Sequence, residues 1–313
     1  MRKYLLHRFL GMLVVMLIVV TTVFLIVRVA PGDPASVMLG VEATAEDIDE
    51  LRRKLGLNDP LYLQYLNYVG QLLKGDLGES IFLRRSVSAA LMERAEPTFF
   101  LALFSLLVGC VIALPIGILA AYYRGSKFDQ IATSVAMVFA SIPSFWLSLL
   151  LIQIVAVKLG VLPVSGYGNP DSGFLERVRH LLLPSLALGV IVSAIIMRFT
   201  RASMIEALNN DFIRTARSKG ASEWRVVMRH ALRNGLIPII TVIGLVIGSL
   251  VSGAIVVETV FGLPGIGNLV VSAVLRRDYP VIQGALLTIA VLYVVVNFII
   301  DMTYLLVDKR VRY

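Results

Sequence analysis

The residue types that carry out catalysis occur in this sequence without the spacing that catalysis needs. The 313 residues contain no G-x-x-x-x-G-K-[ST] phosphate loop, no H-E-x-x-H zinc motif and no G-x-S-x-G nucleophile motif. The three histidines are scattered, and the single cysteine, Cys110, lies in an apolar run, which excludes an intrachain disulfide. We therefore expect no catalytic residue, no metal site and no ATP bound by this chain itself.

Ionisable groups that could relay protons through a membrane are also scarce. Glu258 and Asp301 are the acidic residues nearest to long apolar runs, and each stands close to the end of one. We interpret both as charges at helix ends, because a proton-driven pump needs a relay of ionisable groups inside the membrane. Uncharged polar side chains inside the apolar runs are as typical of helix packing as of a polar path, so no substrate-binding residue is assigned. They are Gln153, Gln283, Asn297, Ser134, Ser141, Ser144, Ser148 and Ser193.

Positive charge gathers in one polar segment, residues 198–235, between two apolar runs. Its eight cations are Arg198, Arg201, Arg214, Arg217, Lys219, Arg225, Arg229 and Arg233. Each would cost about 2.5–3.5 kcal/mol at the bilayer centre, so the segment must lie in water.

The spacing within this segment predicts two helices. Asp211 is expected to cap the first helix, and Gly220 to end it in a left-handed conformation. Ser222 is expected to cap the second helix. An apolar face is expected on the second helix, formed by Trp224, Val227, Met228, Ala231, Leu232 and Gly235.

A helix, a glycine turn and a basic helix also fit a helix-turn-helix DNA reader. Here, however, apolar runs tether both ends within a few residues. We therefore interpret the segment as a surface that binds a cytosolic protein, and expect no nucleic-acid partner.

The composition identifies an integral membrane protein. Hydrophobic residues make up 58% of the chain and charged residues 16%, against about 25% charged residues in soluble domains. Runs of about 20 apolar residues suit helices that cross a hydrocarbon layer of about 30 Å. The sequence predicts an all-α protein with six such spans, at residues 9–27, 99–122, 131–157, 181–197, 236–257 and 281–300, the third of them interrupted by Pro143.

The distribution of Lys and Arg orients these spans. Six spans place both termini on one side. The termini, the turn at 124–127 and the segment 198–235 hold sixteen Lys and Arg, whereas the two short loops opposite hold five. The positive-inside rule then places both termini and the basic segment in the cytoplasm. Residues 31–95 fall outside the cytoplasm.

The long polar region at 31–95 is expected to contain helices. Thr44 and Asp47 have the spacing of a capping box, and a further helix is expected from Pro60 to Lys74–Gly75. The region is too small for a core of its own, so it should pack on the membrane helices. Two interpretations stay open: a solvated loop with two interfacial helices, or a dedicated docking site.

Small residues recur every four positions in the fifth span, at Gly244, Gly248 and Ser252. Such a stripe lets helix backbones approach closely. It serves either packing within the chain or contact with another subunit, and the sequence leaves both open.

The basic segment resembles the cytoplasmic loop of inner-membrane permeases of binding-protein-dependent ABC importers, which has the form EAA-x3-G-x9-I-x-LP. Arg214-Thr215-Ala216 stands at EAA, and Gly220 and Leu232 match the glycine and leucine. His230 replaces the isoleucine and Arg233 the proline.

These departures fit the dipeptide, oligopeptide and nickel branch of that family. The branch has sequence motifs similar to TARSKG at 215–220 and RHALRN at 229–234. Further similar stretches are APGDPA at 30–35, GDLGES at 75–80, ETVFGLPGIG at 258–267 and RRDYP at 276–280.

The resemblance implies half of a translocation pore in a bacterial inner membrane. It implies a homologous second permease, two ATP-binding cassette subunits that hold ATP and Mg, a solute-binding protein outside, and surrounding lipid. It leaves open whether the second permease is another copy of this chain. The ATPase-coupling residues would be Arg214, Thr215, Ala216, Arg217, Ser218, Lys219, Gly220, Ala221 and Ser222.

Under this resemblance the chain divides into an N-terminal tail with the first span (1–30), an extracytoplasmic helical region (31–95) and a permease core (96–313). Di- and oligopeptides are the expected substrates, with nickel chelates and glutathione as alternatives. A self-sufficient secondary transporter or channel is a competing hypothesis. A membrane enzyme is disfavoured because no catalytic constellation is present.

Overall fold

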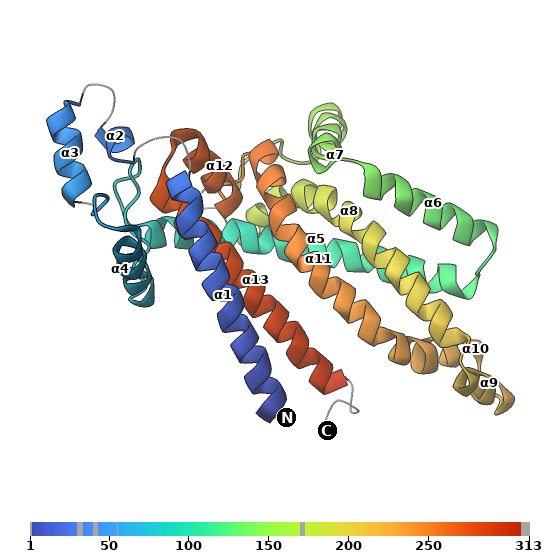
Figure 1. The fold of residues 1–313 in the computed structure, drawn as a ribbon. Coiled ribbons are helices and arrows are strands. Elements are labelled where there is room, and N and C mark those ends of the chain that lie inside the picture. Colours follow the sequence, from blue (N-terminus) through green and yellow to red (C-terminus); the bar gives the residue numbers. More distant parts are fainter. Residues whose placement is uncertain (1, 30–33, 40–42, 55, 170–172, 308–313) are drawn as a thin grey trace. The chain divides into compact units, whose positions relative to one another are not determined.

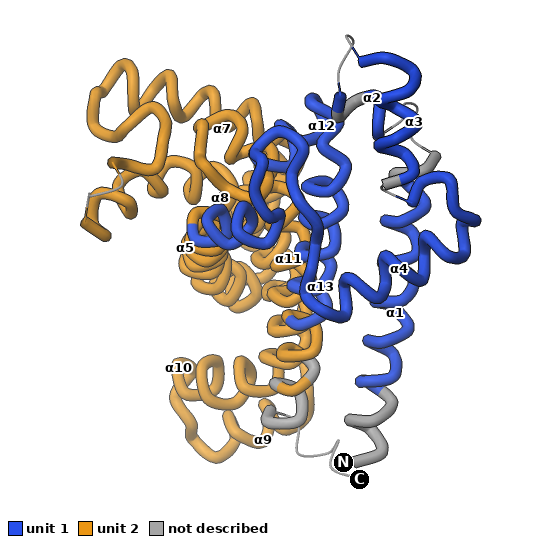
Figure 2. Tube along the Cα trace, turned by 90° about the vertical axis from the view of Figure 1, so that its left-hand side faces the viewer, with its two compact units in different colours: residues 1–96, 268–295 blue, residues 97–267, 296–313 orange. Residues whose placement is uncertain are grey.

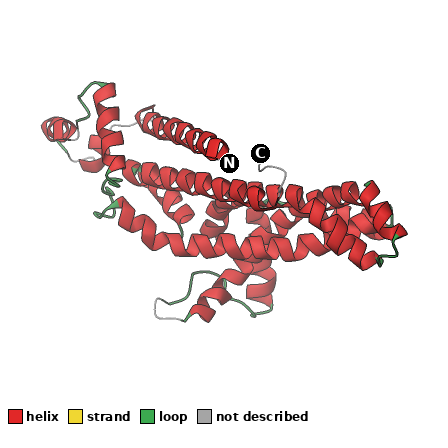
Figure 3. Ribbon diagram, turned by 90° about the horizontal axis from the view of Figure 1, so that it is seen from below, coloured by secondary structure: helices red, strands yellow, loops and turns green. Residues whose placement is uncertain are grey.

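The structure is a computed structural model that describes residues 2–29, 34–39, 43–54, 56–169 and 173–307. Throughout these ranges the chain is helical, joined by turns and loops, with no strand and one isolated bridge between Glu79 and Ser86 (Figure 3). The prediction of an all-α protein is confirmed. The APGDPA stretch and the C-terminal tail lie largely outside the described residues.

The helices follow one another along the chain as Figure 1 shows. They are α1 (Arg2–Val29), α2 (Pro34–Leu39), α3 (Ala45–Lys54), α4 (Leu61–Leu73), α5 (Val87–Tyr122), α6 (Lys127–Ser141), α7 (Ser144–Leu151), the π-helix η1 (Ile152–Lys158), α8 (Phe174–Leu208), α9 (Asp211–Ser218), α10 (Glu223–Arg225), the π-helix η2 (Val226–Ala231), α11 (Leu232–Phe261), α12 (Ile266–Arg276) and α13 (Tyr279–Val307).

Five of the described helices are long and apolar enough to cross a membrane: α1, α5, α8, the continuous rod α10–η2–α11, and α13. The predicted third span forms a bent pair instead of one straight helix. Its arms, α6 and α7–η1, meet at an angle of 100°. Ile142 adopts an extended conformation just before Pro143, as expected of a residue that precedes proline. The total is six spans if this pair counts as one.

Two links that were expected between spans contain helices. Helix α8 begins at Phe174, inside the expected link 158–180, and the 11 residues of α12 lie within the link 258–280. In α12 the buried residues Ile266, Leu269 and Ala273 recur at helical spacing, a pattern that identifies the helix. Sequence reasoning missed it because the helix is too short to span the bilayer.

The chain forms two compact units (Figure 2). Unit 1 comprises residues 1–96 and 268–295, and unit 2 comprises residues 97–267 and 296–313. Within unit 1, Asp278 of the RRDYP stretch joins the end of GDLGES. Its carboxylate accepts a hydrogen bond from Ser80 Oγ at 2.5 Å and others from the N–H groups of Ile81 and Phe82 at 3.3 Å. Two of the family-like stretches are therefore parts of one buried structure.

Within unit 2, α5 and α8 approach through small residues. Ser105, Gly109, Ala113 and Gly117 recur every four positions on α5. A Cβ atom on Gly117 would lie 2.8 Å from Thr200 Cβ and 2.9 Å from the Met197 carbonyl oxygen, so only glycine fits there. This stripe, which the sequence analysis missed, fixes the spacing of the two helices.

One of the small residues of the fifth span, Gly244, packs within the chain. A Cβ atom on Gly244 of α11 would lie 2.5 Å from Ile300 Cδ1 of α13. For Gly244, the structure therefore shows the internal contact.

Candidate functional site

The basic segment forms a short, exposed helix, α9, between the ends of two long ones. Asn210 occupies the N-cap position without a side-chain capping bond, and Asp211 is already the first helical residue. The prediction that Asp211 caps the helix was therefore wrong by one residue. Its carboxylate instead lies 3.5 Å from Arg214 Nη1.

The other end of α9 is as predicted. Gly220 has a φ of +77°, in the left-handed region that glycine adopts without strain. The Gly220 N–H donates to the Arg217 carbonyl at 2.9 Å, and the Ala221 N–H donates to the Ala216 carbonyl at 3.2 Å. These two bonds are the Schellman pattern that closes a helix. A Cβ atom on Gly220 would meet no atom within 4 Å, so this position faces open space.

An ion pair holds the turn after α9. Ser222 stands at the N-cap of α10, as predicted, but its side chain makes no capping bond. Instead the Arg217 guanidinium donates two hydrogen bonds to the Glu223 carboxylate, from Nε to Oε1 at 2.9 Å and from Nη2 to Oε2 at 3.1 Å. The hydrogen bond that Arg217 donates to this carboxylate raises the pKa of Arg217 above its usual range. A bidentate pair of this kind fixes orientation as well as distance.

One apolar side chain anchors α9 to the helices beneath it. Ile213 is completely buried. It belongs to a cluster with Ala121 of α5, Met204 and Ala207 of α8, and Val226, Val227 and Ala231 of η2. Because this cluster joins three long helices of unit 2 to α9, the short helix must move with them.

The nine residues predicted to couple the chain to an ATPase are brought together on this element. Ala216 and Ala221 pack half-buried beside the anchoring cluster. The other seven, Arg214, Thr215, Arg217, Ser218, Lys219, Gly220 and Ser222, are exposed. The arrangement is a rigid, positively charged surface, suited to contact with another macromolecule.

The helix after the turn differs from the prediction in two ways. It does not end before the fifth span, because α10, η2 and α11 run on from Glu223 to Phe261. Trp224, predicted to lie on the apolar face, is 73% exposed. The π-helical turns of η2 change the register, so that Val226, Val227 and Ala231 face the core and Trp224 does not.

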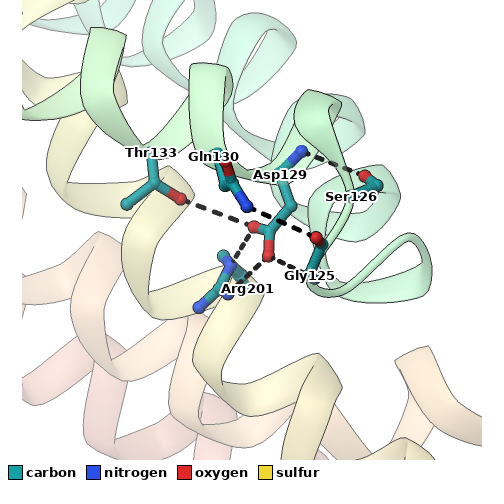
Figure 4. Close-up of polar contacts among 6 residues, drawn as sticks. All are labelled: Gly125, Ser126, Asp129, Gln130, Thr133 and Arg201. Atoms are coloured by element: carbon teal, nitrogen blue, oxygen red, sulfur yellow. Dashed lines mark hydrogen bonds and ion pairs between the residues drawn. The ribbon is translucent and has the colours of Figure 1, made fainter.

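A buried ion pair between α6 and α8 was not predicted (Figure 4). Asp129, at the start of α6, is 3% exposed. Arg201 of α8 donates Nη2 to Asp129 Oδ2 at 2.7 Å and Nε to Oδ1 at 2.5 Å, and the Gly125 N–H donates to Oδ2 at 2.9 Å. Arg201 therefore belongs to an internal contact and not to the exposed cationic surface. The spacing Ser126-x-x-Asp129, a capping-box pattern, signals the start of α6 but not the partner Arg201.

Glu258 stands in the last turn of α11, as expected of a charge at a helix end, but its side chain is fully buried. Thr98 Oγ1 donates to Glu258 Oε1 at 2.6 Å and accepts from the Ile266 N–H at 2.9 Å. Gly265 has no room for a Cβ atom beside the same carboxylate. The glycines of ETVFGLPGIG thus allow the loop to close over Glu258.

We expect Glu258→Ala to lower the thermal stability of the purified transporter. The change leaves the buried Thr98 hydroxyl without this acceptor, a loss of about 1–3 kcal/mol. Thermal unfolding in detergent measures it. Thr98→Ser keeps the hydroxyl and should unfold near the wild-type temperature, while Thr98→Val should resemble Glu258→Ala. Equal unfolding temperatures for Glu258→Ala and wild type would contradict this role.

Comparisons with known proteins agree with the sequence resemblance. Residues 113–313 match the family described as "Binding-protein-dependent transport system inner membrane component", and residues 1–101 match its N-terminal counterpart. The chain is 41% identical, over its whole length and that of each relative, to the "Glutathione transport system permease protein GsiC" of Escherichia coli (strain K12) and of Salmonella typhi.

The fold is similar to that of a solved importer. A chain from "Inward facing conformations of the MetNI methionine ABC transporter" superposes with a TM-score of 0.60, covering 70% of this chain and 96% of that one at 20% identity. The family matches cover well over half of the sequence, and the fold agrees with them. The chain belongs to the inner-membrane permeases of binding-protein-dependent ABC importers, in the family that handles peptides, nickel and glutathione.

Proposed function

We propose that this permease forms half of a pore that imports short peptides, and that residues 214–222 couple the pore to ATP hydrolysis on partner subunits. The observation that carries the substrate class is the 41% identity, over the full length, to permeases named for glutathione transport. Glutathione is itself a tripeptide, so the expectation of peptides and the names of these relatives point to one chemical class.

The geometry of α9 supports the coupling role. ATP can shift the pore only by the difference in the ATPase's affinity for the two pore conformations. Transmitting that difference to the pore requires a rigid element that keeps its conformation when the ATPase moves. Ile213 fixes α9 to three long helices, and the Arg217–Glu223 pair fixes its turn. The exposed Arg214 and Lys219 then present positive charge to the partner.

The proposed assembly contains a second homologous permease, two ATPase subunits that bind ATP and Mg, and a solute-binding protein that delivers the substrate. In this arrangement both termini and α9 face the cytoplasm. The charge distribution supports that orientation, because the side that carries α9 holds most of the Lys and Arg.

Reconstitution tests the proposal. We expect proteoliposomes that hold this chain with its partner permease, ATPases and binding protein to take up labelled glutathione or dipeptides only when ATP is supplied to the ATPases. Nickel chelates serve as the competing substrate. Uptake by this chain alone, driven by an ion gradient, would contradict the coupling role. Uptake of a nickel chelate without uptake of any peptide would contradict the substrate class.

A further inference from the structure

The helix α4, in the region between the first two spans, has an apolar character that an aqueous loop does not need. Its sequence, LYLQYLNYVGQLL, contains no charged residue. The preceding helix α3, AEDIDELRRK, is by contrast mostly charged. No residue of α4 is fully buried by the rest of the chain. At 13 residues, α4 is about 20 Å long, too short to cross the bilayer.

One face of α4 is fixed against α1. Tyr65 and Tyr68 pack on Phe24 of α1. Their ring centroids lie 5.2 and 5.6 Å, respectively, from the ring centroid of Phe24. The Tyr65 hydroxyl and Thr21 Oγ1 are hydrogen-bonded at 2.8 Å. Phe24 is only 2% exposed as a result. The position of α4 along α1 is therefore defined.

These contacts place α4 at the depth of the membrane. The apolar run of α1 extends to Val27, and Thr21 lies six residues earlier, about 9 Å inside that end at 1.5 Å per residue. A second contact agrees with this depth. Val69 and Leu72 of α4 line a cavity of about 630 Å³ together with side chains from the middle of α1 and α13, among them Leu17 and Val291. Among the described residues that line it, Thr288 alone has a polar side chain, and its hydroxyl donates to the Gly284 carbonyl at 2.8 Å.

Four large apolar side chains of α4 are left mostly uncovered by the described chain. Leu61, Tyr62, Leu66 and Leu73 are 61%, 65%, 61% and 84% exposed, and Leu73 also lines the cavity. In water each large apolar side chain left exposed forgoes about 1.5–3 kcal/mol of burial energy. At the depth that Thr21 and Phe24 define, hydrocarbon chains are available to cover them.

We infer that α4 is a membrane-embedded helix that lies in the extracytoplasmic leaflet, its exposed side chains Leu61, Tyr62, Leu66 and Leu73 covered by lipid acyl chains. Helices that lie in the membrane interface bury one apolar face by 5–10 Å in this manner. Tyrosine is also typical of this depth, since its ring is apolar and its hydroxyl reaches water. Part of region 31–95 is then a membrane anchor. This assignment is independent of the transported substrate.

Spin labels at single cysteines test the inference in the assembled transporter, reconstituted into phosphatidylcholine vesicles. The native Cys110 is first replaced by alanine. Labels are placed at Leu66→Cys and Leu73→Cys on α4. The hydrocarbon control is Ile18→Cys, at a residue of α1 that is 59% exposed, and the aqueous control is Glu46→Cys on α3. Power saturation compares collisions with oxygen, which concentrates in lipid, and with a water-soluble nickel chelate.

We expect the labels at Leu66 and Leu73 to collide preferentially with oxygen, as the label at Ile18 does. Preference for the nickel chelate, as at Glu46, would show a solvated helix and overturn the inference. Protection from both reagents in the complete complex, lost when the second permease or the binding protein is omitted, would also overturn it. That result would mean that a protein subunit covers these side chains instead of lipid.

Discussion

Replacing Gly220 with arginine is expected to abolish ATP-driven uptake while leaving the chain inserted in the membrane. The φ of +77° at Gly220 imposes a cost of about 1–2 kcal/mol on any residue with a side chain. The larger effect is steric, because a Cβ at this position points into open space, where the proposed ATPase lies. A long cationic side chain there should prevent close docking. Uptake and co-purification of the ATPases measure the two consequences.

Two further variants separate strain from steric exclusion. Gly220→Ala introduces the same backbone strain with a single methyl group, so uptake should fall only in part. Gly160→Arg is the matched control, because Gly160 also has a positive φ, of +64°, and open space around its Cβ. It lies in the link after η1, outside the coupling surface, and should retain ATPase binding. Normal uptake by Gly220→Arg would remove the coupling role from residues 214–222.

The features that the sequence predicted well are those determined by neighbouring residues. Long apolar runs identify spans because a helix needs about 20 consecutive apolar residues to cross the bilayer. The end of α9 was predictable because its left-handed conformation favours glycine, and the capping box of α3 because Thr44 and Asp47 bond to one another. Thr44 Oγ1 donates to Asp47 Oδ2 at 2.6 Å, a bond that lowers the pKa of Asp47.

The features that were missed depend on contacts between distant segments. Ser80 and Asp278 are 198 residues apart, Thr98 and Glu258 are 160 apart, and Asp129 and Arg201 are 72 apart. Each polar residue by itself reads as a loop or helix-end residue, and only folding shows that it has a partner. The exposure of Trp224 was missed for another reason: the π-helical turns that alter its register leave no clear sign in the sequence.

The ion pair of Asp129 and Arg201 provides the second large expected effect. Removing one member of a buried pair leaves the other charge uncompensated, which costs about 3–5 kcal/mol. Asp129 is nearly inaccessible, and Arg201 has 27% of its side chain exposed, so Arg201→Ala should destabilise the permease most. It leaves the buried carboxylate with the Gly125 N–H and the distant Thr133 hydroxyl as its remaining donors. Thermal unfolding of the purified transporter measures this loss.

A double-mutant cycle distinguishes the pair from the separate effects of its members. In Asp129→Ala/Arg201→Ala neither charge is left unpaired, so the double variant should be clearly more stable than the sum of the single losses implies. Arg85 and Glu93 form a contrasting pair at 2.6 Å, with side chains 39% and 59% exposed. Because water screens such a pair, Arg85→Ala should cost no more than about 1 kcal/mol.

The Asp129–Arg201 pair joins α6 to α8, and α8 ends ten residues before Ser218, the last residue of α9. Its loss should therefore also weaken the coupling of ATP hydrolysis to uptake in the fraction of protein that stays folded. Additive losses in the cycle, or full coupling in folded Arg201→Ala, would show that α6 is held to α8 by packing alone.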